Sequence, residues 1–210
     1  MTAYAYRKSR ILVPSPHYPC IIYRVMDPTT EFLADARSQF DKYRVAAELA
    51  MAQVSDNDLF DVPFAGGNSI AIIAKHLAGN MLTRWTNFLT TDGEKKDRNR
   101  DDEFEMDPGW TRDDLMAYWE RGWSCVSTAM DSLTEEDLAR SVTIRGEEHS
   151  VVRAISRQMT HYAYHVGQIV LLARVHAGDS WQTLSIARGE SKQFNEKHWG
   201  ARSANMPDPG

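Results

Sequence analysis

The chain has 210 residues, of which 42% are hydrophobic and 25% are charged. These values are typical of a globular protein and argue against a disordered or fibrous one, and the length suits one domain with a sizeable core. The formal net charge of −5 argues against nucleic acid as a partner. No apolar run reaches the roughly 18 residues that a membrane-spanning helix needs, so no membrane partner is expected.

The two cysteines, Cys20 and Cys125, are too few for a disulfide framework and form no CxxC pair. We expect free thiols and a cytoplasmic protein. Basic and apolar residues near the N-terminus are interrupted by prolines and lack a small-residue cleavage site, so they do not predict a signal peptide. Residues 1–28 are predicted to form an irregular arm, and Met26 is a candidate for the natural start of the protein.

Apolar residues recur at helical spacing in four stretches of the chain. We predict helices over residues 30–50, 70–88, 111–130 and 151–176. Thr29 or Thr30 is expected to cap the first helix, and Thr111 with Asp114 resembles a capping box at the start of the third. Gly178 stands where the C-terminal cap of the last helix belongs.

The segments between these helices are polar. Residues 91–109 are predicted to form a long loop, and its charged run from Asp92 to Glu105 is interpreted as solvated rather than as a lid. Residues 134–138 predict a short helical turn, and apolar residues on both sides of residues 145–148 weakly favour a hairpin before the last helix. From about Gly189 the tail shows no clear period.

The predicted fold class is all-α, because four amphipathic helices joined by turns and one long loop are typical of a four-helix bundle. The expected organisation is an arm over residues 1–28, a bundle over 29–195 and a C-terminal tail over 196–210. Strands do not alternate with helices, and Gly66-Gly67 stands alone. A parallel α/β sheet and a nucleotide-binding glycine loop are therefore not predicted.

Two histidines, His161 and His165, stand four residues apart on the last predicted helix and share one face of it. This spacing allows two imidazoles to bind one metal ion. Both lie at the flank of the apolar stripe, as does His76 on the second helix. Two helices that meet along such flanks would bring three imidazoles together. Alternatively, each is an ordinary boundary histidine bonded to water, and the spacing leaves both interpretations open.

Two segments resemble a known family. Residues 67–81 (GNSIAIIAKHLAGNM), followed by Arg84-Trp85, resemble the second helix of the DinB/YfiT-like metalloenzyme superfamily. Residues 154–169 (AISRQMTHYAYHVGQI) resemble the last helix of one of its subfamilies, whose function is unknown. The resemblance extends over about residues 29–195.

This resemblance implies a four-helix bundle of DinB/YfiT-like type, often a homodimer, with one divalent first-row metal ion per chain. The implied ligands are His76, His161 and His165, and all three are present. Imidazole ligands favour Zn²⁺ or Ni²⁺ and are compatible with Fe²⁺ or Mn²⁺. Known enzymes of the superfamily are mainly thiol-dependent transferases and isomerases. The expected partner is thus a small-molecule substrate, with a low-molecular-weight thiol as a candidate.

Three neutral imidazoles leave coordination positions open, which is typical of a catalytic metal. We therefore expect an enzyme that activates water or a small thiol for attack on a small electrophilic substrate, as a transferase or a hydrolase. The rival hypothesis is a non-catalytic helical bundle dimer that binds a metal or a partner protein. A third hypothesis is a protein-interaction dimer with incidental histidines.

Three polar residues are candidates for orienting the ligands or contacting the substrate. Asn80 lies one turn past His76, and Gln168 lies three residues past His165, so each can reach the same side of its helix. Arg84 could bind an anionic substrate group, although a salt bridge is the preferred interpretation. The spacing of the acidic residues identifies no general base.

Overall fold

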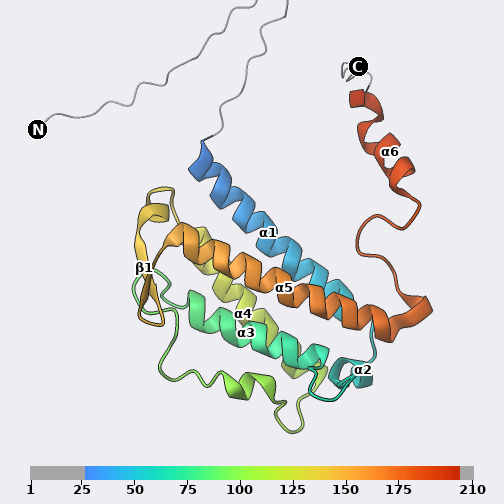
Figure 1. Ribbon diagram of the computed structural model, residues 1–210, viewed down its shortest axis with the longest axis horizontal. Helices are drawn as coiled ribbons and strands as arrows, with labels where there is room; N and C mark the ends of the chain where they lie inside the picture. Colours follow the sequence, from blue (N-terminus) through green and yellow to red (C-terminus); the bar gives the residue numbers. More distant parts are fainter. Residues whose placement is uncertain (1–26, 204–210) are drawn as a thin grey trace, which may run out of the picture.

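The computed structural model describes residues 27–203, and side chains up to residue 197. Met26 and nearly all of the predicted arm lie outside the described residues, as do residues 204–210 of the predicted tail. The described part is mostly helical, with two short strands (Figure 1). Its α-helices are α1 (Pro28–Met51), α2 (Asp56–Phe60), α3 (Ile70–Trp85), α4 (Arg112–Ser132), α5 (Val151–Ala177) and α6 (Ser191–Ser203). Shorter elements are the 3-10 helices η1 (Asp101–Phe104), η2 (Glu136–Ala139) and η3 (Gly178–Ser180), and the strands β1 (Ser141–Ile144) and β2 (Glu147–Ser150).

The first turns of the long helices are closed by side-chain caps. At α4 the predicted capping box is present, because Thr111 accepts from the Asp114 backbone N–H and the Asp114 carboxylate accepts from the Thr111 backbone N–H. At α1 the predicted cap was wrong. The cap is Asp27, whose carboxylate accepts from the backbone N–H groups of Thr29 and Thr30. Pro28 then occupies the first helical position, where its missing N–H costs nothing.

The core lies between the four long helices. Helix α1 packs against α5, and α3 packs against both α4 and α5 (Figure 1). Phe40 of α1 contacts one aromatic ring from each of the other three, with centroid distances of 5.5 Å to Trp85, 6.5 Å to Trp123 and 5.6 Å to Tyr162. All four side chains are buried, and such edge-on and tilted contacts add to the free energy of apolar burial.

The predicted hairpin before the last helix is present. Strands β1 and β2 are antiparallel, with Ile144 opposite Glu147. The two turn residues, Arg145 and Gly146, both have positive φ, which suits the twist of a two-residue hairpin. The next element, α5, follows without a loop and ends at Ala177, and Gly178 is its C-terminal cap as predicted, with a positive φ of 52°.

Two predicted boundaries differ from the structure. Helix α3 ends at Trp85 rather than at residue 88, because the backbone turns at Thr86 and Asn87 has a positive φ of 51°. The region after Gly189 contains α6, which the sequence did not predict. An apolar stripe is the main signal for a helix, and this segment is largely polar.

Across the described residues, no helix has both the length and the apolar character that crossing a bilayer would require.

Candidate metal centre

The structure brings His76, His161 and His165 together where α3 lies beside α5. One ring nitrogen from each comes within 4.8 Å of the others. His76 is buried at 3% exposure, and the other two are half-buried. The three residues that the resemblance implies as metal ligands therefore form one cluster that could hold a metal ion.

The distance between the nearest two nitrogens fits a shared ion. His76 Nε2 and His161 Nε2 are 3.3 Å apart. Two nitrogens bound tetrahedrally to one ion, at about 2.0–2.1 Å each, would be separated by about 3.3–3.4 Å. This pair of nitrogens is thus already at the separation that a shared first-row metal ion requires.

The far nitrogen of His76 has an acidic partner. His76 Nδ1 lies 2.8 Å from Glu103 Oε2, and both side chains are buried. An ionised carboxylate can only accept a hydrogen bond, so Nδ1 carries the proton and Nε2 keeps its lone pair. This is the tautomer that binds a metal through Nε2.

A similar contact occurs at His165, whose Nδ1 lies 2.8 Å from Gln168 Oε1. The amide oxygen accepts from Nδ1–H and again leaves Nε2 with a lone pair. Gln168 thus lies beside a histidine of the cluster, as its spacing suggested.

His161 differs from the other two histidines. Its Nδ1 is buried and has no hydrogen-bond partner among the described residues. Burial, followed by the nearby His165 and His76, lowers the pKa of His161 to about 3. Burial also lowers the pKa of His165. Both rings are therefore neutral near pH 7, the form in which imidazole binds a metal.

The other two candidate residues lie in different networks. Arg84 is buried and forms an ion pair with Glu94 at 2.9 Å, which matches the salt-bridge interpretation. Asn80 Oδ1 accepts from the Tyr162 hydroxyl at 3.3 Å. That hydroxyl accepts in turn from Trp85 Nε1 at 2.9 Å. Asn80 thus joins the aromatic core and has no hydrogen bond to the histidines.

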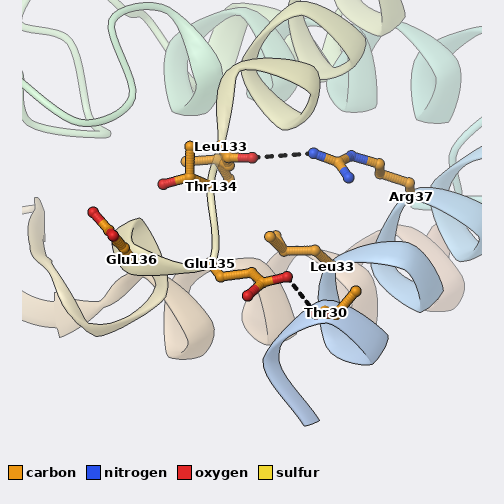
Figure 2. A pocket seen from close by; sticks show the side chains of 7 residues that line it. All are labelled: Thr30, Leu33, Arg37, Leu133, Thr134, Glu135 and Glu136. Carbon is orange, nitrogen blue, oxygen red and sulfur yellow. Dashed lines mark hydrogen bonds between the residues drawn. The ribbon is translucent and has the colours of Figure 1, made fainter. Parts of the chain in front are cut away.

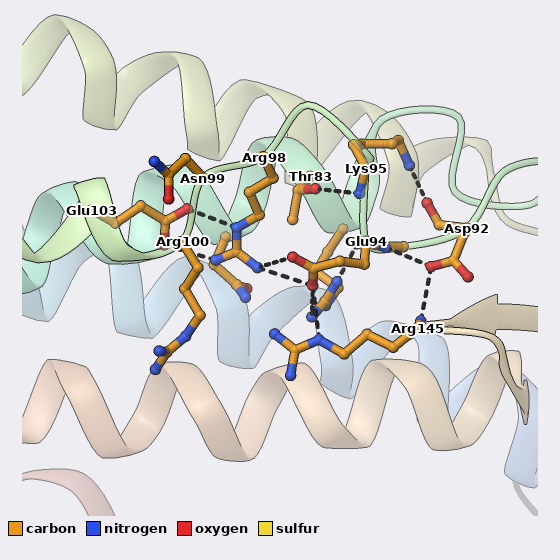
Figure 3. Close-up of polar contacts among 12 residues, drawn as sticks. Thr83, Asp92, Glu94, Lys95, Arg98, Asn99, Arg100, Glu103 and Arg145 are labelled. Carbon is orange, nitrogen blue, oxygen red and sulfur yellow. Dashed lines mark hydrogen bonds and ion pairs between the residues drawn. The ribbon is translucent and has the colours of Figure 1, made fainter.

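Glu103 is the residue that sequence reasoning missed. It lies in the charged run that was interpreted as solvated, yet only 6% of it is exposed. Figure 3 shows this run folded into a network of ion pairs, in which Arg98 contacts both Glu94 and Glu103. Phe104, an aromatic residue within a charged run, was the one signal that this segment folds back onto the protein.

The charge of Glu103 is well compensated. Burial tends to raise the pKa of its carboxyl, but hydrogen bonds from His76 and Arg98 outweigh this effect and lower the pKa below its usual value. Glu103 is therefore ionised near pH 7 and can act as a permanent acceptor.

One surface hollow lies away from this cluster. It has a volume of about 520 Å³ and lies between the start of α1 and the segment after α4 (Figure 2). Arg37 crosses it and donates to the backbone oxygens of Met130 and Leu133, which satisfies carbonyls at the end of α4. None of the three clustered histidines lines this hollow.

Comparison with curated proteins finds no match. Residues 27–190, which include the histidine cluster and Glu103, match a family described as "Protein of unknown function (DUF1572)". Because this match covers well over half of the chain, the protein belongs to the DUF1572 family.

Proposed function

We propose that the protein is a metal-dependent enzyme whose four long helices form a bundle of the DinB/YfiT-like type. His76, His161 and His165 would hold one divalent first-row ion, with Zn²⁺ or Ni²⁺ favoured. The reaction would be the attack of water or a small thiol on a small electrophilic substrate, as in a transferase or a hydrolase. The observation that carries this proposal is the convergence of three imidazoles within 4.8 Å of one another.

The donor set supports the proposal. A bound divalent ion supplies Lewis acidity, which makes a coordinated water or thiol more acidic. Three protein ligands leave room for such a group, whereas structural zinc sites usually have four. The acceptors at His76 and His165 orient the two rings, and burial keeps His161 neutral. In this proposal, residues of the chain hold the ion and orient the imidazole rings that bind it.

The resemblance supplies two other parts of the proposal, a homodimer and a low-molecular-weight thiol as cosubstrate, and the small number of cysteines supplies the cytoplasmic location. No described residue has been assigned to binding that thiol. The cosubstrate is best found by screening once a bound metal has been identified.

Elemental analysis of protein purified without chelator tests the metal site. We expect about one first-row ion per chain in the wild type and little in His161→Ala. His176→Ala is the matched control, because His176 lies on the same helix but pairs with Asp58 at 3.4 Å outside the cluster. Absence of a stoichiometric ion from the wild type, even after incubation with Zn²⁺ or Ni²⁺, would overturn the proposal.

The reaction class is tested on the metal-loaded protein. Consumption of a small thiol by an electrophilic aryl halide and hydrolysis of activated esters should be assayed in parallel with His161→Ala. Activity that requires the metal in either assay supports an enzyme. A bound metal without turnover across such a panel would instead favour the non-catalytic metal-binding protein.

A further inference from the structure

The contact between Glu103 and His76 points to a specific role for the loop after α3. We infer that Glu103 is a positioning residue, which holds His76 in the Nδ1–H tautomer and thereby sets the metal affinity of the cluster. This inference rests on the proposed function, because it concerns the same metal site. Its physical basis is that an acceptor on the far nitrogen of a ligating histidine fixes the ring and makes the near nitrogen more basic.

The geometry makes Glu103 act through His76 rather than as a ligand. Its Oε2 lies 2.8 Å from Nδ1, on the ring edge away from the Nε2 atom that faces His161. Its Oε1 is taken by Arg98, whose Nε lies 2.7 Å away. Both carboxylate oxygens thus have partners, His76 Nδ1 and Arg98, other than a metal ion bound between the histidines.

Arg98 fixes the orientation of the carboxylate. Its Nε donates to Oε1 and its Nη2 donates to Oε2 of Glu103, both at 2.7 Å. Such a two-pronged contact restrains the plane of the carboxylate as well as its position. The Arg98 side chain is only 6% exposed, so water weakens the pair little.

The missing side chain of Gly79 on helix α3 leaves space for the same carboxylate. A Cβ atom at this position would lie 2.6 Å from Glu103 Oε1 and 2.8 Å from Glu103 Cδ. Glycine within a helix costs roughly 0.5–1 kcal/mol relative to alanine. The close approach of Glu103 gives a physical reason for this glycine, one turn along from His76.

The backbone on both sides of Glu103 is also attached to α3. Lys75 Nζ donates to the carbonyl of Asp102 at 2.9 Å and to that of Glu105 at 2.7 Å. Between these points, the Phe104 ring stacks on the His76 ring, with a centroid distance of 4.6 Å and an interplanar angle of 28°. Helix η1 thus makes two contacts with the His76 imidazole: Glu103 bonds to its Nδ1 edge, and Phe104 stacks on its face.

The first experiment needs no metal. Long-range ¹H–¹⁵N NMR of the metal-free protein reports which nitrogen of His76 carries the proton. We expect Nδ1–H in the wild type and a shift to mainly Nε2–H in Glu103→Ala. Glu103→Gln, which keeps an acceptor of similar size, should retain more of the Nδ1–H form. Unchanged Nδ1–H in Glu103→Ala would overturn the inference.

The second experiment measures Zn²⁺ affinity by competition with a chromogenic chelator. We expect Glu103→Ala to weaken Zn²⁺ binding by about 10- to 100-fold, and Glu103→Gln by less. Glu94→Gln is the matched control, because it removes another carboxylate that pairs with Arg98, at 3.1 Å, without touching His76. Its affinity should stay near that of the wild type.

The outcomes separate this inference from the proposed function. No Zn²⁺ binding by the wild type would refute the metal site, while the NMR measurement would still test the tautomer. Zn²⁺ binding that is lost in His161→Ala but unchanged in Glu103→Ala would refute the role of Glu103 alone. If circular dichroism shows that Glu103→Ala is unfolded, Glu103→Met, which has a similar length but no oxygen acceptor, decides: a Zn²⁺ affinity equal to that of the wild type, with unchanged Nδ1–H, would overturn the inference.

Discussion

Two helical glycines, Gly79 and Gly167, have opposite surroundings. A Cβ at Gly79 would collide with the Glu103 carboxylate, whereas a Cβ at the exposed Gly167 would meet no atom within 4 Å. Replacement of either glycine by alanine removes the same conformational freedom from the unfolded chain. A lower stability or Zn²⁺ affinity of Gly79→Ala relative to Gly167→Ala therefore reports on the contact with Glu103.

Gly79→Ala should lower both stability and Zn²⁺ affinity. The new methyl group must displace the Glu103 carboxylate, which weakens its charged hydrogen bonds, each worth about 1.5–3 kcal/mol. Gly167→Ala should instead raise the free energy of unfolding by about 0.4–1 kcal/mol. Urea denaturation of both variants, together with Zn²⁺ titration, measures these effects. A Gly79→Ala variant whose free energy of unfolding rises as much as that of Gly167→Ala would contradict the prediction.

Tyr162→Phe should destabilise the protein while sparing the metal site. The substitution leaves Trp85 Nε1 and Asn80 Oδ1 without their buried partner, which should cost about 1–3 kcal/mol. The ring that packs on Phe40 is kept. Urea denaturation measures the loss, and a weakened Zn²⁺ affinity in this variant would contradict the separation of the two networks.

At the residue scale, prediction from sequence worked where the partners share a helix. The spacing of His161 and His165, and of Gln168 after His165, is fixed by helix geometry alone. The contact between Glu103 and His76 joins a loop to a helix, and no periodicity encodes it. Helical spacing alone did not predict the partner of Asn80. Its spacing from His76 places it on the same side of α3, but it accepts a hydrogen bond from Tyr162 on another helix.

Among the elements, the loop after α3 is attached to the hairpin by a carboxylate. Asp92 accepts from the backbone N–H groups of Arg145 at 2.8 Å and Gly146 at 2.9 Å (Figure 3). The Gly93 N–H donates to Thr143 O at 2.7 Å. The segment that bears Glu103 is therefore fixed at its start by β1 and the hairpin turn.

This attachment should weaken in acid. Burial tends to raise the pKa of Asp92, but backbone hydrogen bonds from Glu94, Gly146 and Arg145 lower it below the ordinary 3.8. The unfolded chain thus takes up this proton at a higher pH than the folded protein. The stabilisation is complete above the ordinary pKa and is lost as pH falls through the folded pKa.

The variant Asp92→Ala tests this pH dependence. Its melting temperature should be lower than that of the wild type at pH 7, and this difference in melting temperature should become smaller as pH falls below 3.8. Thermal melts followed by circular dichroism measure the difference. A gap that stays constant with pH would show that the Asp92 charge is irrelevant to stability.

Element prediction depended on the apolar pattern. Helices α1, α4 and α5 each bury one side, whereas α3 is buried at every residue except the half-buried Leu82. All four carry apolar residues at the helical spacing that reveals them. Helix α6 was missed because it is largely polar. The charged loop was misinterpreted because its ion pairs, unlike an apolar stripe, leave no period in the sequence.

For the molecule as a whole, the aromatic core is separate from the proposed metal site. The aromatic contacts of Phe40 join all four long helices without any of the clustered histidines. Removal of metal should therefore leave the helical circular dichroism signal nearly unchanged. Zn²⁺ at about 100 times its Kd should add about 2.7 kcal/mol to the free energy of unfolding.

Thermal melts with and without Zn²⁺ check this expectation. The wild type should melt at a higher temperature with Zn²⁺, and His161→Ala should show no such shift. Loss of helical signal in the metal-free wild type would instead indicate a metal that is required for folding.

The helical class and the approximate positions of the four long helices followed from the sequence, but which helices are neighbours did not. The placement of α3 beside α5 assembles the cluster, and this pairing depends on side-chain packing between distant segments. The flank position of His76 allowed it to meet the histidines of the last long helix, and the family resemblance implied that it would.

The distance along the chain between the histidines has a consequence for biosynthesis. His76 and His161 are 85 residues apart, so ribosomes complete α3 long before α5 exists. Closing so large a loop is entropically costly and must await docking of the later helix. A nascent chain consequently has no three-histidine cluster before α5 has docked, so binding of an ion at the proposed site would be a late step that requires α3 and α5 to have paired.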